Sequence, residues 1–121
     1  MRSLILWVTF AAALVAPAYA DDYPVSGRWG QSTGSQKGAI DCSGRRVIAF
    51  NGNQRTDSKG GVPAYRNRSV TSDGPAQYRI VDEFSNGLMN DAHTTYTLRR
   101  ADSDRLIMQM QGGTLTLQPC K

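Results

Sequence analysis

The sequence is short, mildly basic and poor in metal-binding side chains. Its 121 residues are enough for one domain, and a formal net charge of +4 favours anionic partners without requiring one. Because the chain has one histidine and two cysteines, a multi-histidine metal site within one chain is excluded. We expect neither a metal nor another cofactor.

Residues 1–20 have the pattern of a secretory signal peptide. One basic residue, Arg2, precedes an apolar run over 4–16, and small residues follow up to Ala20. The apolar run is shorter than the roughly 20 residues that a membrane-spanning helix needs. We therefore expect cleavage after Ala20. This leaves a single domain, residues 21–121, that is exported to the periplasm or secreted and has no membrane span.

The mature chain predicts a lean hydrophobic core. Only 32 of its 101 residues are hydrophobic, and a domain of this size buries only about two-thirds of the surface that its unfolded chain exposes. Cys42 and Cys120 are the only cysteines, and in an exported protein they predict one intramolecular disulfide. If disulfides act through the entropy of the unfolded chain, closing so long a loop is worth about 4 to 5 kcal/mol. A reactive thiol or a metal-binding pair has no further cysteine or histidine cluster to support it.

Arginine dominates the positive charge of the mature chain. Thirteen basic residues stand against ten acidic ones, and ten of the thirteen are arginines. This balance favours contact with an anionic ligand or surface, whereas export makes nucleic acid an unexpected partner. The alternative is that the arginines only solubilise the outer face of a sheet.

Turn-forming residues divide the mature chain into short segments in which apolar and polar side chains alternate. This alternation, with no window of helical periodicity, is typical of an all-β domain. The expected strands span, in chain order, 26–31, 38–42, 45–51, 53–58, 63–72, 76–84, 91–100, 106–111 and 114–118. The last two should form a hairpin, because Gly112 and Gly113 can supply the positive φ angles of a tight two-residue turn.

Eight or nine short antiparallel strands must either stack as a sandwich or close as a small barrel. Closure removes exposed edges, and about eight strands enclose an interior that side chains fill or that holds one small ligand. Because the connections are short, we expect an up-and-down antiparallel barrel of about eight strands, stapled by one disulfide. A β-sandwich is the alternative.

The segment Gly27-Arg28-Trp29 resembles the Gly-x-Trp opening of calycin-type barrels, which include lipocalins, avidins and small secreted bacterial metalloprotease inhibitors. The resemblance covers the first strand in detail and implies a lipocalin-like barrel. In those families the tryptophan closes one end of the barrel, which implies that Trp29 is a structural plug. The inhibitors carry a more local disulfide than Cys42 and Cys120 would form, and this departure counts against inhibition.

Asp82 is expected to point into the barrel, because it alternates with Tyr78 and Ile80 along one predicted strand. A buried carboxylate needs a partner such as an arginine, and Arg100 falls on the corresponding face of a neighbouring strand. Tyr78 and Asp82 are therefore candidate ligand contacts inside a small pocket. The alternatives are a satisfied ion pair at the barrel mouth, which has a structural role only, or a bulge that turns Asp82 outward.

The segment GGVPAYRNRSV, residues 60–70, predicts a turn followed by a strand that has no clean core face. Its proline cannot donate to a ladder and marks a strand start or an edge. Tyr65 then falls on one face, whereas Arg66, Arg68 and Val70 fall on the other. The tyrosine and the two arginines are candidate contacts for an anionic or aromatic ligand. The alternative is a solvated edge strand that arginine and proline protect from aggregation.

Three functions remain open from the sequence. The preferred one is a monomeric, non-enzymatic barrel that binds a small molecule or an anionic envelope component. The second is a secreted inhibitor of a protease or another hydrolase, with an extracellular enzyme as partner. An enzyme is not expected, because His93 is the only histidine, no nucleophile motif occurs, and the adjacent Asp82 and Glu83 point to opposite faces.

Overall fold

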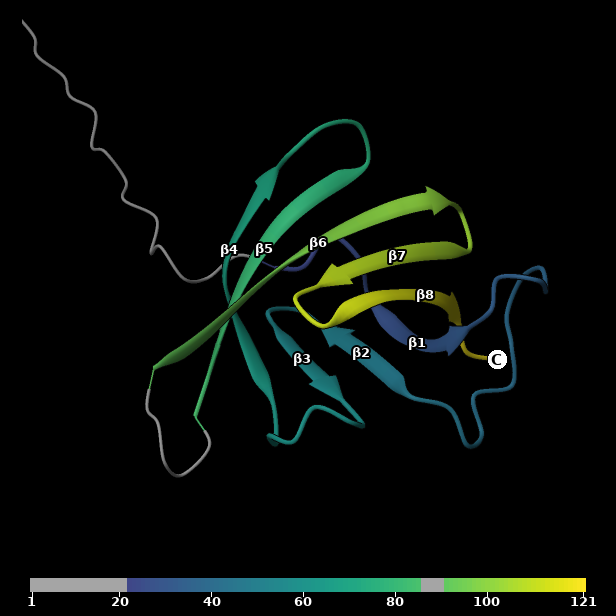
Figure 1. Ribbon diagram of the computed structural model, residues 1–121, viewed down its shortest axis with the longest axis horizontal. Coiled ribbons are helices and arrows are strands. Elements are labelled where there is room, and N and C mark those ends of the chain that lie inside the picture. Colours follow the sequence, from purple (N-terminus) through teal and green to yellow (C-terminus); the bar gives the residue numbers. More distant parts are fainter. Residues whose placement is uncertain (1–21, 86–90) are drawn as a thin grey trace, which may run out of the picture.

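The computed structural model describes residues 22–85 and 91–121 and shows eight antiparallel strands closed into a barrel (Figure 1). The strands are β1 (Gly27–Ser32), β2 (Val47–Asn51), β3 (Gln54–Asp57), β4 (Tyr65–Ser72), β5 (Gln77–Phe84), β6 (Ala92–Asp102), β7 (Arg105–Met110) and β8 (Gly113–Pro119). Each strand pairs with the next, and β8 returns to β1. The predicted all-β barrel is confirmed, and the sandwich alternative is wrong. The described residues form no helix, and accordingly none that could cross a membrane.

Alternation of inward and outward side chains builds one core inside the barrel. Most of the predicted inward residues of β5 to β8 are buried, among them Ile80, Leu98 and Leu106. Tyr78, Phe84 and Met110 are only partly buried. The complete buried apolar cluster is Tyr23, Val25, Trp29, Ile48, Phe50, Ile80, Tyr96, Leu98, Leu106, Met108, Leu115 and Leu117. In contrast, β3 and β4 bury the polar residues Arg55 and Asn67. One sector of the barrel interior is therefore polar.

Residues 38–42, predicted as a strand, form none. Ile40 makes a single parallel bridge to Cys120, in which its N donates to the O of Pro119 at 2.8 Å and its O accepts from the N of Lys121 at 2.9 Å. The side chain of Ile40 is 1% exposed. The segment is anchored by Ile40 and by the disulfide of Cys42, whereas the positive φ of Gly38 (75°) interrupts an extended conformation.

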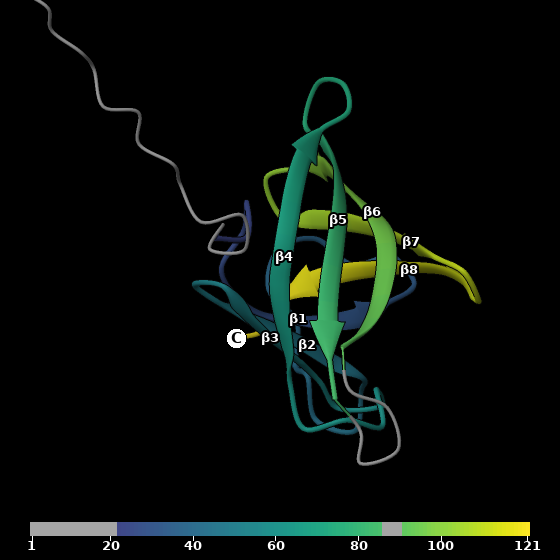
Figure 2. The ribbon, with the colours of Figure 1, turned by 90° about the vertical axis from the view of Figure 1, so that its left-hand side faces the viewer.

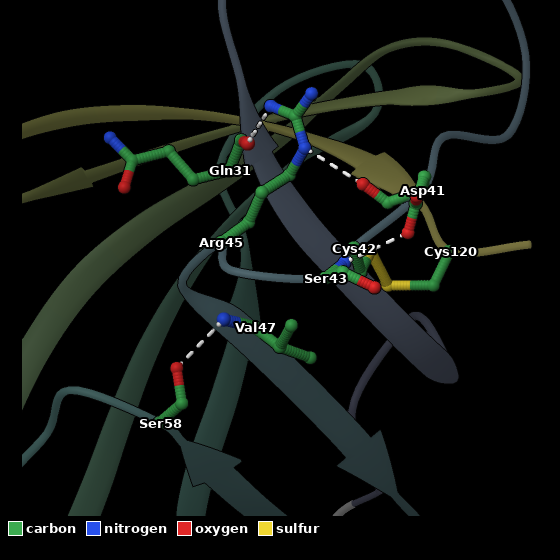
Figure 3. The surroundings of a disulfide bond; sticks show 8 residues. All are labelled: Gln31, Asp41, Cys42, Ser43, Arg45, Val47, Ser58 and Cys120. Carbon is green, nitrogen blue, oxygen red and sulfur yellow. Dashed lines mark hydrogen bonds between the residues drawn. A yellow bond between two sulfur atoms is a disulfide. The ribbon is translucent and has the colours of Figure 1, made fainter.

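A disulfide joins Cys42 to Cys120, with their Cα atoms 5.5 Å apart and a sequence separation of 78. It lies against Gly30 of β1, where a Cβ atom would come within 2.5 Å of the Cys42 Sγ, so a side chain at this position would collide with the sulfur. Beside it, the Nη1 of Arg45 donates to the O of Gln31 at 3.0 Å (Figure 3). The predicted disulfide is confirmed, and it fastens the loop between β1 and β2 to the C-terminal end of β8.

The hairpin of β7 and β8 is confirmed, but its turn lies one residue earlier than predicted. Met110 pairs with Gly113, so Gln111 and Gly112 form the connection. Gly113 is instead the first residue of β8 and has a φ of 147°. The prediction of a Gly112-Gly113 turn is therefore wrong by one position.

The segment before β1 is folded into the barrel core. Tyr23 and Val25 are buried, and the N of Tyr23 donates to the O of Gly52 at 2.9 Å. The Tyr23 ring packs edge-on against Phe50 with ring centroids 5.0 Å apart. Trp29 is buried in the same cluster. Its role in closing one end of the barrel stays a prediction.

Candidate functional site

A buried ion pair between Arg55 and Asp82 occupies the polar sector of the barrel. The Nε of Arg55 lies 2.7 Å from the Oδ2 of Asp82, and both side chains are almost fully buried. Asp82 therefore points inward and has a guanidinium partner, as its burial requires. The suggested partner, Arg100, is wrong: its guanidinium lies over the Trp29 ring at 5.8 Å and donates to the O of Ser103.

Both carboxylate oxygens of Asp82 accept hydrogen bonds from other side chains of the protein. Its Oδ1 accepts from the hydroxyl of Tyr23 at 2.9 Å and from the Nδ2 of Asn67 at 3.3 Å. Its Oδ2 accepts from the Nε of Arg55 at 2.7 Å and from the hydroxyl of Tyr96 at 3.0 Å. Each oxygen has two lone pairs, so these four donors leave no acceptor capacity for a ligand. Asp82 is thus part of a satisfied ion pair, as one alternative from the sequence expected, but the pair is fully buried and not at the barrel mouth.

The network fixes the protonation of the two phenols. Burial raises the pKa of Tyr23 far above its ordinary value, and the neighbouring Asp82 carboxylate raises it further. Burial likewise raises the pKa of Tyr96, against the opposing effect of Arg55. Burial alone would lower the pKa of Arg55, but Tyr96 and Asp82 raise it above its ordinary value. Both phenols therefore stay protonated and act as donors to Asp82.

Arg55 is also enclosed by aromatic rings and a second carboxylate. Its guanidinium carbon lies 3.9 Å from the ring centroid of Tyr65 and 4.9 Å from that of Tyr96. Its Nη1 is 3.9 Å from the Oδ2 of Asp57, which also accepts from the Nη2 of Arg46 at 2.7 Å. Burial alone would raise the pKa of Asp57, but the hydrogen bond from Arg46 lowers it below its ordinary value. The cluster thus links β3, β4, β5 and β6 to Arg46, the residue before β2.

Alkaline pH should unfold the protein partly through these tyrosines. Because their folded pKa values are raised, their stabilising contribution is present below the ordinary tyrosine pKa of about 10 and is lost as the pH rises above it. The free energy of unfolding should fall by about 1.4 kcal/mol per pH unit for each such tyrosine. Tyr23→Phe should remove one of the two contributions, which urea titrations at a series of pH values would measure. Equal slopes for wild type and variant would contradict this prediction.

A β-bulge in β4 reverses the alternation of inward and outward side chains after Arg68. Asn67 pairs with Asp82, but the next pair is Ser69 with Val81. Arg68 is therefore an extra residue on β4. A bulge of this kind bends the strand and re-aims its side chains.

The β4 candidates precede this reversal and lie on the faces that alternation predicts. Tyr65 is buried inside the barrel, whereas Arg66 and Arg68 are exposed outside. Val70 was predicted to share the face of the arginines, and this is wrong: after the bulge it packs against the core. Tyr65 therefore faces away from the two arginines across the barrel wall.

A cleft of about 530 Å³ lies where β4 begins and β5 ends. Its lining residues are Asn53, Gln54, Pro63, Ala64, Tyr65, Arg66, Glu83, Phe84, Ser85 and Asp91. Two of the predicted contacts, Tyr65 and Arg66, are among these lining residues. Tyr78 instead lines a separate pocket of about 50 Å³ with Val25 and Leu98. The five candidate residues therefore do not form one site. Tyr65 and Arg66 line the cleft, Tyr78 lines the small pocket, Asp82 belongs to the buried network and Arg68 lies on the outer surface.

The described residues hold no group of three or more histidine, cysteine, aspartate or glutamate side chains arranged to bind a metal. His93 is exposed on β6, with its Nε2 4.0 Å from the Oε1 of Glu83. The same carboxylate oxygen accepts from the Nη1 of Arg68 at 3.1 Å. These contacts lie on the outside of the barrel.

Comparison with known proteins gives no relative from which a function could be transferred. No family model matches the chain, and no curated protein or solved structure is significantly similar to it.

Proposed function

We propose that the chain is an exported, non-enzymatic binding protein that holds a small zwitterionic molecule in the cleft at the start of β4. The observation that carries the proposal is that an arginine and an aspartate, Arg66 and Asp91, line the same cleft. Both side chains are exposed, and neither has a hydrogen-bond or ion-pair partner among the described residues. Arg66 can bind a carboxylate of the ligand, and Asp91 can bind an ammonium group of the ligand.

The rest of the lining supports a ligand with an apolar part. Tyr65 and Phe84 pack edge to face with ring centroids 5.3 Å apart, and both line the cleft. Glu83 also lines it, but its charge is offset by Arg68 at 3.1 Å. The volume lies within the range of about 300 to 1,000 Å³ that small-molecule sites occupy. A dipeptide with one apolar side chain has the required charges and shape.

The backbone of Asp91 adds a second argument. Asp91 has a φ of 60°, in the left-handed region that residues other than glycine seldom adopt. Such a conformation costs about 1 to 3 kcal/mol and is concentrated at functional sites. Aspartate tolerates it better than most residues.

Calorimetric titration with glycyl-phenylalanine tests the proposal. The free dipeptide should bind, and its N-acetylated and C-amidated forms, which each lack one charge, should bind more weakly. Arg66→Gln and Asp91→Asn should each weaken binding by about tenfold or more, as expected for a charged hydrogen-bond partner. Arg79→Gln, which lies outside the cleft, is the matched control. If the capped dipeptides bind as tightly as the free one, or if the cleft variants bind it as tightly as the wild type, the charges do not select the ligand.

The exported location is part of the proposal. A disulfide is consistent with an oxidising compartment, and the first twenty residues predict a signal peptide. The alternative of a hydrolase inhibitor stays a prediction from the sequence.

A further inference from the structure

The outer surfaces of β4, β5 and β6 form one face of the barrel, and Figure 2 shows these three strands in front. This face has a strong excess of positive charge. Four exposed arginines lie on it: Arg66 and Arg68 on β4, Arg79 on β5 and Arg99 on β6. The described parts of these strands present two acidic side chains outward, Glu83 on β5 and Asp102 at the end of β6. Each is already paired with an arginine, Glu83 with Arg68 at 3.1 Å and Asp102 with Arg105 at 3.5 Å.

Strand register places two of these arginines close together. Arg79 pairs with Thr97, and Arg99 pairs with Gln77, which is two residues before Arg79 on β5. The arginines are therefore diagonal neighbours on one face, about 7 to 8 Å apart at their Cα atoms. Neither has a hydrogen-bond or ion-pair partner in the described part of the chain. Two like charges held side by side without a counter-ion favour an anionic partner.

The face has a second cationic site further along the same strands. Arg66 pairs with Glu83, which lies four residues from Arg79 on β5. At about 3.3 Å per residue, the two sites are about 13 Å apart along the strand. A partner with repeated negative charges can contact both sites at once, whereas a small anion can contact only one.

The side chains between the arginines indicate the chemistry of this partner. They are mostly hydroxyl and amide groups, including Thr71, Thr95 and Thr97 on the outer face and Gln77 beside Arg99. The outward positions of β4 to β6 that the structure describes include no aromatic side chain that could insert into a lipid headgroup layer. Hydroxyl and amide groups can instead hydrogen-bond to the hydroxyls of a sugar chain.

We propose that the outer face of β4, β5 and β6 binds an acidic polysaccharide. Guanidinium groups at the two cationic sites bind carboxylates of separate sugar units, and the threonines between them bind ring hydroxyls. This surface shares Arg66 with the cleft of the proposed function, whereas Arg79 and Arg99 are not among the cleft residues. Variants at Arg79 and Arg99 therefore test this surface separately from the cleft.

Binding of the full mature protein to polygalacturonate oligomers tests the proposal, with the methyl-esterified polymer as the matched uncharged ligand. The acidic polymer should bind, the esterified one should not, and added salt should weaken binding. Arg79→Gln together with Arg99→Gln should weaken binding about thirtyfold, at about fivefold for each cation facing an anionic surface. The control is Arg28→Gln together with Lys37→Gln, which removes the same charge from exposed positions elsewhere on the protein. This control should change the binding of polygalacturonate less than about twofold.

Four outcomes would overturn the proposal. The first is no binding of polygalacturonate by a folded protein, and the second is equal binding of the esterified polymer. The third is an equal loss in both double variants, which would mean that net charge rather than this face is responsible. The fourth is binding to phosphatidylglycerol vesicles that is tighter than to the polymer and is lost in the Arg79 and Arg99 variant, which would assign the face to lipid.

Discussion

Asp82→Asn is expected to lower the free energy of unfolding by about 3 to 5 kcal/mol, the usual cost of removing one member of a buried ion pair. The amide keeps the volume of the carboxylate, so the loss comes from the charge and not from a cavity. Arg55 is left in the barrel interior with only Asp57, at 3.9 Å, as a carboxylate neighbour. The hydroxyls of Tyr23 and Tyr96 and the amide of Asn67 also lose part of their acceptor. Urea titration monitored by circular dichroism measures the change.

Asp73→Asn is the matched control, because Asp73 is an exposed residue of the turn between β4 and β5. It should change stability by less than about 0.5 kcal/mol. Arg55→Met should cost about as much as Asp82→Asn, and the two together should cost less than their sum, because either change already breaks the pair. Additive losses in this double-mutant cycle would show that the ion pair is not the unit of stabilisation.

Loss of the Cys42–Cys120 disulfide is expected to destabilise the barrel by about 4 to 5 kcal/mol in the chain-entropy treatment. The bond closes a loop with a sequence separation of 78, so its removal frees nearly the whole chain in the unfolded state. In the folded state it also frees the loop that crosses Gly30. Urea titrations of the oxidised protein with and without dithiothreitol, followed by tryptophan fluorescence, measure this difference.

The double variant Cys42→Ala, Cys120→Ala provides the control for reduction. Its urea midpoint should match that of the reduced wild type and should not respond to dithiothreitol. A wild-type midpoint that is the same in both conditions would falsify the claim that the bond stabilises the fold.

Period-two alternation and turn residues were sufficient to predict the barrel, because both are local properties of the sequence. Alternation along β5 placed Ile80 and Asp82 inside, and the same reasoning held for Leu106 and Met108 on β7. It failed at Val70, because a single extra residue, Arg68, reverses the faces of β4. A bulge depends on pairing with a neighbouring strand, which the sequence of one strand does not record.

Arg55 is the residue of the buried network that sequence reasoning missed. Its neighbours in Gln54-Arg55-Thr56-Asp57 are all polar, so the segment has no apolar alternation that marks an inward face. The residues that could have placed Arg55 inside the barrel lie in the preceding turn. Asn51 pairs with Gln54 across Gly52 and Asn53, and this register sets Arg55 opposite the buried Phe50.

The candidate ligand contacts were predicted only in part. Tyr65 and Arg66 line the cleft, but Phe84 and Asp91 reach it from strand ends that are distant in the sequence. Tyr78 was grouped with Asp82 because the two residues share a face of β5, and this is correct. Tyr78 lies four residues before Asp82, however, and therefore lines the pocket beside Val25 and not the polar sector. A shared face does not imply a shared site.

The position of the disulfide also determines what a protease can do to this molecule. Cys42 and Cys120 enclose β2 to β8 in one covalent ring and leave β1 and the segment before it outside. A single cut in an exposed turn of that ring, such as the one after β4, therefore produces two pieces that remain joined. The nicked chain gains only the mass of one water molecule and does not separate into fragments until it is reduced, and its strands stay close enough to remain paired. In surroundings rich in hydrolases, the barrel can thus survive one cleavage that would divide an uncrosslinked protein of this size.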